Sequence, residues 1–372
     1  MKLSANRTTF LAELQLVGRA ASTRTSIAAL GGILIETGEG NAALAATDAE
    51  LAMRSNVEVE VEQPGRVLLP ARLLVEIVRA LDGESVTLEY RPDQGHVAVS
   101  SERAEFHIRT LPAEDFPRLP DPADGAMGLS GEVFSQTVER VAKAASRDET
   151  RPVLTGILVS VAEDRLRMVA TDSYRLSVKE TALQNGAASS FEANIPARTL
   201  QEAGRLVRET GAEQVTLATQ DNQIVFSIDR VLLSSRLIDG QFPNYERLLP
   251  DSFEHEVQVS RPELAGVVRR VGLMAQRNSP LRMRFEEGSL TVSAQTPDIG
   301  EATESVPVNF QGEQLEIGFN PGFLQDGLES VESDDVQIKL ISPVRPGLLE
   351  AAGADEADGR FLYLIMPVRL NV

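Results

Sequence analysis

The sequence repeats itself at a spacing of about 125 residues, and this period constrains the fold more than any other feature. Three segments share one pattern: LLPARLLVEIVRALDGESVTLEY (68–90), NIPARTLQEAGRLVRETGAEQVTLAT (194–219) and GFNPGFLQDGLESVESDDVQIKL (318–340). In each, a proline lies near the start of an apolar helical pattern, a polar turn follows, and an alternating strand comes last. Solenoid repeats run about 20–50 residues, so this period is that of a whole domain.

Other segments recur in the same order. ILIETGEGNAALAATDAELAM (33–53) corresponds to ILVSVAEDRLRMVATDSYRLSV (157–178), and DFPRLPD (115–121) corresponds to QFPNYERLLPD (241–251). Each copy also opens with a helical pattern, at 6–19, 132–147 and 261–277. Strands that bracket two helices in every copy predict an α+β fold of three repeated domains.

The expected domain boundaries lie in two stretches that are rich in proline, aspartate or glycine. These stretches are LPDPADGAMG (119–128) and LPDSFEHEVQ (249–258). Such residues favour turns and linkers over helix or strand. The sequence therefore predicts domains at residues 1–120, 128–250 and 251–372.

Several kinds of chemistry are excluded by composition. The chain has no cysteine, so it has no disulfide, thiolate nucleophile or cysteine-ligated zinc, and its only histidines are His96, His107 and His255. No phosphate-binding glycine loop, zinc-protease motif or nucleophile elbow occurs. Thr-Asp recurs at Asp48 and Asp172, and we expect a side-chain-capped turn there rather than a paired carboxylate site. We predict a binding scaffold that has no catalytic residue, cofactor or metal.

The N-terminal sequence MKLSANRTTFLAEL alternates polar and apolar residues and lacks the apolar core of a signal peptide. No stretch approaches the roughly 18 apolar residues of a membrane helix. We therefore expect a cytoplasmic protein with no membrane partner.

Positive charge is concentrated in the expected helices, although the whole chain carries a net charge of −19. Five of the six expected helical segments are net positive, and only the sixth, at 321–333, is acidic. A shared basic surface in an acidic protein indicates a polyanion partner held by phosphate contacts, without sequence readout. The ordinary alternative is a set of solvated helix faces. The residues assigned to this surface are Arg72, Arg79, Arg140, Lys143, Arg147, Arg198, Arg205 and Arg277.

Three Arg-Leu pairs occur where the repeats differ from one another. They are Arg175-Leu176, Arg247-Leu248 and Arg369-Leu370, accompanied by Tyr174, Pro243 and Pro367. If the three segments converge, they form an apolar pocket with a cationic rim, which suits a short apolar peptide that carries a carboxylate. The alternative is that the tail is the last strand of the third domain, and a strand end can also line a pocket.

The combination of ATDSYRL, FPNYERLLP and a terminal MPVRL on a triplicated chain resembles the bacterial sliding clamps, the beta subunits of DNA polymerase III. The resemblance covers the whole length. It implies a non-enzymatic ring closed by head-to-tail dimerisation, with helices lining the interior and sheets outside. It also implies double-stranded DNA, the replicative polymerase catalytic subunit, a clamp loader and other proteins with clamp-binding motifs as partners.

Site residues follow from the resemblance position by position. It adds Leu154, Thr171, Met366 and Val368 to the peptide pocket, and Arg24 to the DNA-contacting set. It implies a dimer interface made by Phe106, Ile108, Leu273 and Met274. Ser173-Tyr174 replaces a Gly-His of some relatives, and Asn371 and Val372 extend past their terminal leucine. Two alternatives stay open: a monomeric peptide-binding adaptor, and an enzyme with triplicated domains.

Overall fold

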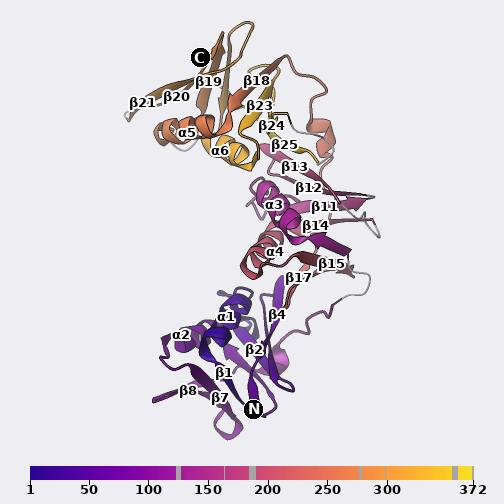
Figure 1. Ribbon diagram of the computed structural model, residues 1–372, viewed down its shortest axis with the longest axis vertical. Coiled ribbons are helices and arrows are strands. Elements are labelled where there is room, and N and C mark those ends of the chain that lie inside the picture. The colour runs from indigo at the N-terminus through magenta and orange to yellow at the C-terminus, as the bar shows by residue number, and fades with distance from the viewer. Residues whose placement is uncertain are drawn as a thin grey trace. The chain divides into compact units, whose positions relative to one another are not determined.

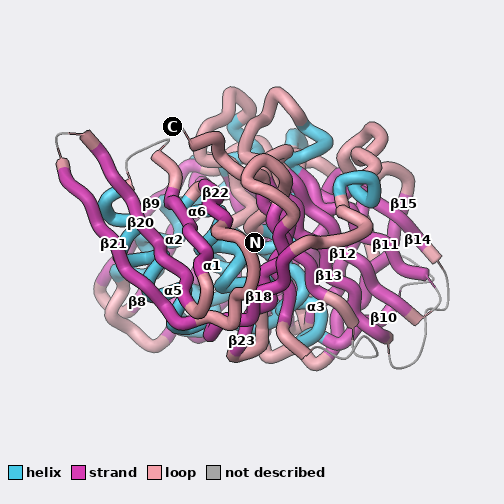
Figure 2. The backbone as a smooth tube through the Cα atoms, turned by 90° about the horizontal axis from the view of Figure 1, so that it is seen from above, coloured by secondary structure: helices cyan, strands magenta, loops and turns pink. Residues whose placement is uncertain are grey.

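The computed structural model describes residues 1–122, 127–162, 164–183, 190–275, 279–297, 299–353 and 359–370. Within these ranges the chain forms six α-helices and four antiparallel sheets, which confirms the predicted α+β class (Figures 1 and 2). The chain divides into two compact units. The first comprises residues 1–131 and 206–237, and the second comprises 132–205 and 238–372.

The first unit contains a five-stranded and an eight-stranded sheet. The smaller sheet has the order β5 (Glu60–Gln63), β1 (Lys2–Asn6), β7 (Ser85–Arg91), β8 (His96–Ser101), β9 (Ala104–Arg109). The larger sheet has the order β10 (Met127–Ser130), β15 (Gln214–Gln220), β16 (Gln223–Ile228), β17 (Val231–Arg236), β4 (Leu51–Glu58), β3 (Asn41–Thr47), β2 (Gly32–Thr37), β6 (Arg66–Pro70).

Helices α1 (Arg7–Gly18) and α2 (Ala71–Ala80) pack on each other in the first unit, and α1 also packs on β2, β3 and β4. The Asn6 side chain caps α1 by accepting a hydrogen bond from the Thr9 amide at 3.1 Å. The buried face of α1 also carries a carboxylate, Glu13, which accepts hydrogen bonds from Ser55 Oγ at 2.6 Å and from Arg230 Nη2 at 2.6 Å. This ion pair satisfies a buried charge and ties α1 to the hairpin of β16 and β17.

The second unit contains an eight-stranded and a four-stranded sheet. The larger sheet has the order β14 (Phe191–Pro196), β11 (Gly156–Ala162), β12 (Arg165–Thr171), β13 (Arg175–Ala182), β25 (Phe361–Ile365), β24 (Gly347–Ala351), β23 (Asp335–Leu340), β18 (His255–Ser260). The smaller sheet has the order β21 (Gly300–Pro307), β20 (Ser289–Thr296), β19 (Leu281–Glu286), β22 (Leu315–Phe319).

The remaining helices are α3 (Gly131–Ala142), α4 (Ala197–Thr210), α5 (Arg261–Val271) and α6 (Pro321–Ser330). Three expected helices were too long at their C-terminal ends, and the pattern at 321–333 ends at Ser330. The helical pattern at 132–147 ends at Ala142, because the chain turns away and the Ser146 amide donates to the Leu154 carbonyl at 2.9 Å. The pattern at 261–277 ends at Val271, where Gly272 begins the 3-10 turn η6 (Gly272–Met274).

Each eight-stranded sheet is made of two four-stranded halves that come from adjacent sequence repeats. Strand β4 of the first repeat pairs with β17 of the second, and β13 of the second pairs with β25 of the third. The two compact units therefore follow the sheets, because each eight-stranded sheet includes half of the middle repeat. The predicted domain boundaries are boundaries between sequence repeats, and they stay a prediction.

Among the strands in the position where repeats join, two lie at sheet edges. Strand β9 occupies in the first repeat the place that β17 and β25 occupy in the other two, and β21 occupies in the third repeat the place of β4 and β13. The sheet orders give β9 and β21 one strand neighbour each, whereas β4, β17, β13 and β25 have two. An open edge presents unpaired backbone groups and favours pairing with another chain.

The terminal apolar run forms β25, which is buried along its whole length between β13 and β24. The strand ends at Ile365, two residues before Pro367, as expected for a residue that cannot donate to the ladder. None of the helices in the described ranges has the length and apolar character needed to cross a bilayer.

Candidate functional sites

A cavity of about 670 Å³ in the second unit brings together two of the three Arg-Leu pairs. Its walls come from the β12–β13 turn, the segment 247–254, the β23–β24 loop and the end of β25. The lining residues predicted from sequence are Thr171, Arg175, Leu176, Arg247, Leu248 and Met366. This volume is in the range of pockets that bind small ligands or short peptide anchors.

The floor of the cavity belongs to a buried apolar cluster. Leu176 and Leu364 of the paired strands β13 and β25 pack with Phe242 of the repeated Phe-Pro motif and with Tyr245 just after it. Above this floor, Leu248, Val344 and Met366 are large apolar side chains that remain exposed. Exposed apolar side chains grouped around a cavity are a common mark of an interaction site.

The Thr-Asp segment forms the side-chain-capped turn that the sequence predicts. Thr171 Oγ1 donates to the Arg175 carbonyl at 2.7 Å, and Asp172 Oδ1 accepts from the Tyr174 amide at 2.9 Å. The first repeat has the same turn, in which Thr47 Oγ1 donates to the Leu51 carbonyl at 2.8 Å. The middle residue of each turn, Ser173 and Ala49, has a positive φ of 80° and 78°. Both aspartates therefore cap turns, and the cap holds Arg175 at the cavity wall.

Arg175 was predicted to lie on a cationic rim, but its side chain is mostly covered and already paired. Its guanidinium bonds Asp172 at 3.1 Å, Asp326 at 2.5 Å and the Tyr363 hydroxyl at 3.2 Å, and it lies 4.3 Å from the centre of the Phe323 ring. Burial raises the pKa of the Tyr363 phenol, while Arg175 acts in the opposite direction. With two carboxylates already bound, Arg175 fixes the cavity wall to α6.

The cationic rim is supplied instead by Arg247 and Arg345. Both line the cavity, and Arg247 lies in the exposed 3-10 turn η5 (Tyr245–Leu248). Asp251 and Glu254 also line it. A cavity with apolar side chains, two arginines and two carboxylates can hold an apolar peptide and orient its charged residues.

Seven residues predicted for the pocket do not line this cavity. They are Leu154, Tyr174, Pro243, Pro367, Val368, Arg369 and Leu370. The third Arg-Leu pair does not join the other two, because the tail runs along β22, where the Val368 amide donates to the Gly318 carbonyl at 2.8 Å. Tyr174 is exposed and stacks on Phe323, with ring centroids 6.4 Å apart. Leu154 is buried in the 3-10 turn η4 (Pro152–Thr155).

Sequence analysis missed the β23–β24 loop, which supplies Ile341, Val344, Arg345 and Pro346 to the cavity. The stretch ISPVRPG carries a proline-flanked apolar and basic signal of the same kind as MPVRL. It also missed Ser173, Leu249, Pro250, Asp251, Ser252, Glu254 and Leu364. The comparison of repeats identified the segments at 174–176, 243–248 and 366–370. It did not identify the β23–β24 loop of the third repeat.

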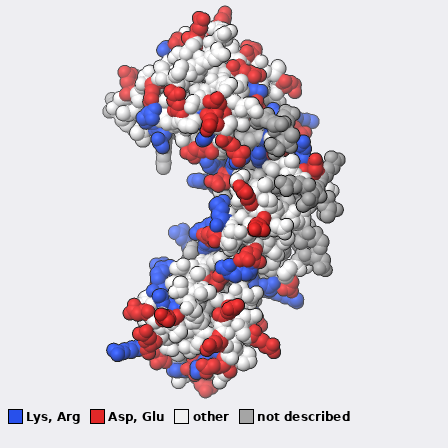
Figure 3. Space-filling view, in the orientation of Figure 1, with Lys and Arg blue, Asp and Glu red and all other residues white. Residues whose placement is uncertain are grey.

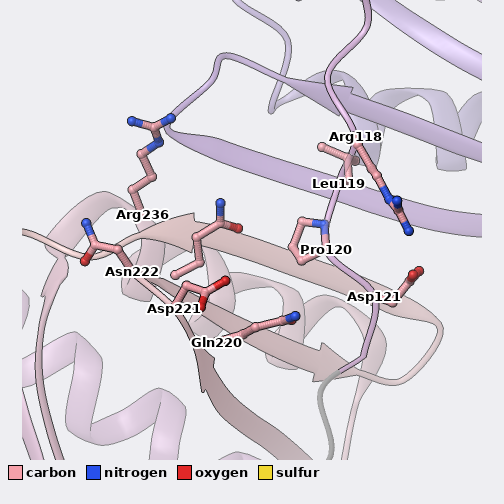
Figure 4. Close-up of a pocket in the computed structure, with 9 residues that line it drawn as sticks. Arg118, Leu119, Pro120, Asp121, Gln220, Asp221, Asn222 and Arg236 are labelled. Atoms are coloured by element: carbon pink, nitrogen blue, oxygen red, sulfur yellow. The ribbon is translucent and has the colours of Figure 1, made fainter.

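The first unit has a cavity of about 480 Å³ built from the corresponding elements of the preceding repeats. Figure 4 shows Arg118 to Asp121 of the segment after the first Phe-Pro motif, facing the β15–β16 turn at Gln220 to Asn222 and Arg236 at the end of β17. Its lining contains Leu119 and Pro120 but is otherwise polar or charged. Without an apolar floor it does not suit an apolar peptide, so we expect one such site per chain.

The predicted DNA-contacting residues of the first unit lie on α2 and in the segment after α1. Arg72 is exposed and bonds Glu76 at 2.9 Å within α2, and Arg24 and Arg79 are exposed. Figure 3 shows Lys and Arg side chains gathered on the flank of this unit that carries α1 and α2. A cavity between these helices is lined by Arg19, Arg72 and Arg79. This face can contact phosphates without reading bases.

The basic residues expected in the other helices have mixed environments. Arg140 is largely covered and paired with Glu332, and Lys143 pairs with Glu329 at 3.0 Å. Arg147 is exposed but lies beyond the end of α3, and Arg198 and Arg205 are exposed on α4. Arg277 lies outside the described residues.

The residues predicted for a dimer interface lie on or beside the edge strands β9 and β21. Phe106 is exposed on β9, and Leu273, in η6 beside β20 and β21, has an exposed fraction of 82%. Met274 is half-buried in the same turn. Ile108 lies two residues along β9 and therefore on the same face as Phe106, yet it is only 2% exposed because neighbouring side chains cover it.

No group of three or more histidine, aspartate or glutamate side chains that could hold a metal ion occurs in the part of the chain that the structure describes. At the peptide-sized cavity, Asp172 caps a turn and pairs with Arg175, which also pairs with Asp326.

Known proteins match the whole chain. The N-terminal, central and C-terminal domain descriptions of the DNA polymerase III beta subunit match residues 1–120, 128–244 and 246–369. The "Beta sliding clamp" of Streptomyces coelicolor is 35% identical, with 100% of both chains covered. The chain belongs to the DNA polymerase III beta subunit family. The beta sliding clamp of Synechococcus elongatus is another relative, 33% identical over 100% of both chains.

Solved structures of this family have the same fold. The DNA polymerase sliding clamp of Bacillus subtilis superposes with a TM-score of 0.93 at 28% identity, with 100% of each chain covered. A sliding clamp of Pseudomonas aeruginosa, described as bound to griselimycin, gives a TM-score of 0.90 at 27% identity over the same coverage. Family membership makes the chain a non-enzymatic processivity factor and excludes the triplicated-domain enzyme.

Proposed function

We infer that the chain is a DNA sliding clamp, which encircles duplex DNA and tethers the replicative polymerase and other DNA-processing proteins in the cytoplasm. The observation that carries this inference is the match of the entire chain, with all three domains in order, to sliding clamps. The exposed basic face of α1 and α2 supports contact with phosphates. Such contact is salt-screened and independent of sequence, which permits sliding.

We propose that two copies close the ring head to tail, with β9 of one copy pairing with β21 of the other. The support is the repeat pattern, because the strands equivalent to β9 and β21 already pair at the two junctions within each chain. A second copy would complete both open edges by the same contact. A heterologous contact of this kind forms a ring when its rotation closes. A clamp loader is then needed to admit DNA.

The proposed function is tested by retention on DNA of two shapes. We expect the chain, loaded with its cognate loader and ATP, to remain on a nicked circular plasmid during gel filtration and to leave once the plasmid is cut. Retention on a ring is topological, so linearisation removes it while the phosphate contacts stay the same. Equal retention on circular and linear DNA would contradict encirclement.

We propose that the cavity of about 670 Å³ binds the peptide motif of the partners, and that Arg345 and Arg247 bind the acidic residue of that motif. Arg175 cannot take this role, since Asp172 and Asp326 already occupy its guanidinium. The peptide's apolar side chains would cover Leu176, Leu248 and Leu364. Competing partners could exchange, because ordering costs offset much of the burial of a short peptide.

Arg345→Ala is expected to weaken binding of an acidic, apolar partner peptide by about two- to fivefold, since a solvent-exposed ion pair contributes about 1 kcal/mol or less. Calorimetry would compare the peptide with its Asp→Asn or Glu→Gln form. The variant should lose the preference for the acidic form and retain affinity for the amide form. Arg284→Ala, on β19 and paired with Glu286 at 3.5 Å, is the control. An undiminished preference in Arg345→Ala would remove this residue from the recognition.

A further inference from the structure

The carboxylates of α6 and of the residues just after it face basic partners. Asp326 bonds Arg175 at 2.5 Å, Glu329 bonds Lys143 at 3.0 Å, and Glu332 pairs with Arg140. Arg140 and Lys143 belong to the basic set expected to face DNA. The helix that departs from the basic pattern therefore lies against part of that set.

The carboxylates of two of these pairs face solvent more than their partners do. Side-chain exposure is 49% for Glu329 and 55% for Glu332, but 13% for Arg140 and 28% for Lys143. A polyanion approaching this face meets the carboxylates before the cations. Like charges repel an approaching phosphate over about one Debye length, roughly 8–10 Å at ordinary salt.

Glu329 is held in its ionised form by its surroundings. A hydrogen bond from Gln325 Nε2 at 2.9 Å lowers the pKa of the Glu329 carboxyl, and Lys143 and Arg269 lower it further. The charge lies in the last turn of α6, where the helix dipole is unfavourable to an anion. The cations of α5 and of the segment after α3 offset that cost.

We propose that Glu329 and Glu332 limit the affinity of the chain for DNA by occupying Lys143 and Arg140 in place of phosphate. The inference rests on the proposed DNA-binding function. In this proposal, the face of α1 and α2 attracts DNA phosphates, whereas the face where α3 meets α6 is nearly neutral toward them. A sliding protein benefits from such a face, because each phosphate contact that is not made lowers the force opposing movement.

The test measures binding of a short duplex to the full-length protein by fluorescence anisotropy over a series of salt concentrations. The variant E329Q/E332Q removes both charges and keeps the shape of the side chains. We expect affinity to rise by about threefold to tenfold near 0.1 M salt. We also expect the slope of log affinity against log salt to steepen by about 1, the increment of one added phosphate contact.

Two controls separate a local effect from net charge. E192Q/E286Q, on strands β14 and β19, changes the net charge by the same amount away from the helices. It should leave the salt slope unchanged. Adding K143Q to E329Q/E332Q should restore the original slope, because the freed lysine makes the new contact. If the double variant has a lowered melting temperature, E329Q alone replaces it in the test, because E329Q leaves the largely covered Arg140 paired with Glu332.

The outcomes are distinguishable. Equal affinity gains in E329Q/E332Q and E192Q/E286Q, with equal slopes, would overturn this inference and leave the proposed function standing. A wild-type protein that binds no duplex at any salt concentration would overturn both. A steeper slope that disappears with K143Q would support the inference.

Discussion

Replacing Leu273 with aspartate is expected to convert the protein from a dimer to a monomer. Leu273 is an apolar side chain with an exposed fraction of 82%, and its turn contacts β20 and the open edge strand β21. Central apolar residues of an interface contribute about 2–4 kcal/mol each, and a buried unpaired carboxylate adds a further penalty. The dimer dissociation constant should therefore rise by about 100-fold or more. Sedimentation equilibrium would report a mass near 40.3 kDa for the variant.

Leu248→Asp is the matched control for this prediction. It places the same charge on another exposed leucine, which lines the peptide-sized cavity of the second unit. It should abolish peptide binding and leave the dimer intact, whereas Leu273→Asp should do the reverse. A Leu273→Asp protein that remains a dimer would contradict the proposed interface. A wild-type protein that is already a monomer would favour the peptide-binding adaptor.

Arg175→Ala is expected to have the largest effect on stability, lowering the free energy of unfolding by about 3–5 kcal/mol. The substitution leaves Asp172 and Asp326 facing each other without their shared cation and removes the contact with the Phe323 ring. Urea denaturation followed by circular dichroism measures the change. Peptide affinity should fall as well, because the cavity wall loses its attachment to α6.

Arg247→Ala separates the role of support from that of recognition. Arg247 is exposed in η5 and lines the same cavity, so its removal should weaken peptide binding and change the free energy of unfolding by less than about 0.5 kcal/mol. If Arg175→Ala were as stable as wild type and lost only peptide affinity, Arg175 would be a rim residue after all.

The fold could be predicted because its signals are local and recur in two or three of the repeats. A proline before a helical pattern, a Phe-Pro motif after a strand and a Thr-Asp turn each specify one conformation, and repetition removes ambiguity about which signal is accidental. Helix ends were less predictable. The pattern after Ala142 remains amphipathic, but a tertiary hydrogen bond from the Ser146 amide to Leu154 turns the chain away.

The peptide-sized cavity could be predicted where the role of a side chain depends on its residue type. It was less predictable where that role depends on residues that are distant in the sequence. The Arg-Leu pairs at 175 and 247 do reach one cavity. The sequence could not reveal that Asp326 would take up the charge of Arg175, since the two lie 151 residues apart. Ile108 and Phe106 are two residues apart on one strand, yet only Phe106 is exposed, because sheet packing and not spacing decides which is covered.

The strand pairing across repeats also determines where such a molecule can come apart. The β4–β17 and β13–β25 pairings lie within one polypeptide, so a broken pairing re-forms at the high effective concentration set by the connecting chain. A pairing between β9 and β21 of different copies has no such tether, and its occupancy depends on protein concentration. The three kinds of strand pairing are geometrically similar. They would thus differ in lifetime only because two of them lie within one polypeptide and the third does not. A protein that opens the proposed ring would act at one of the two β9–β21 seams, which no backbone spans.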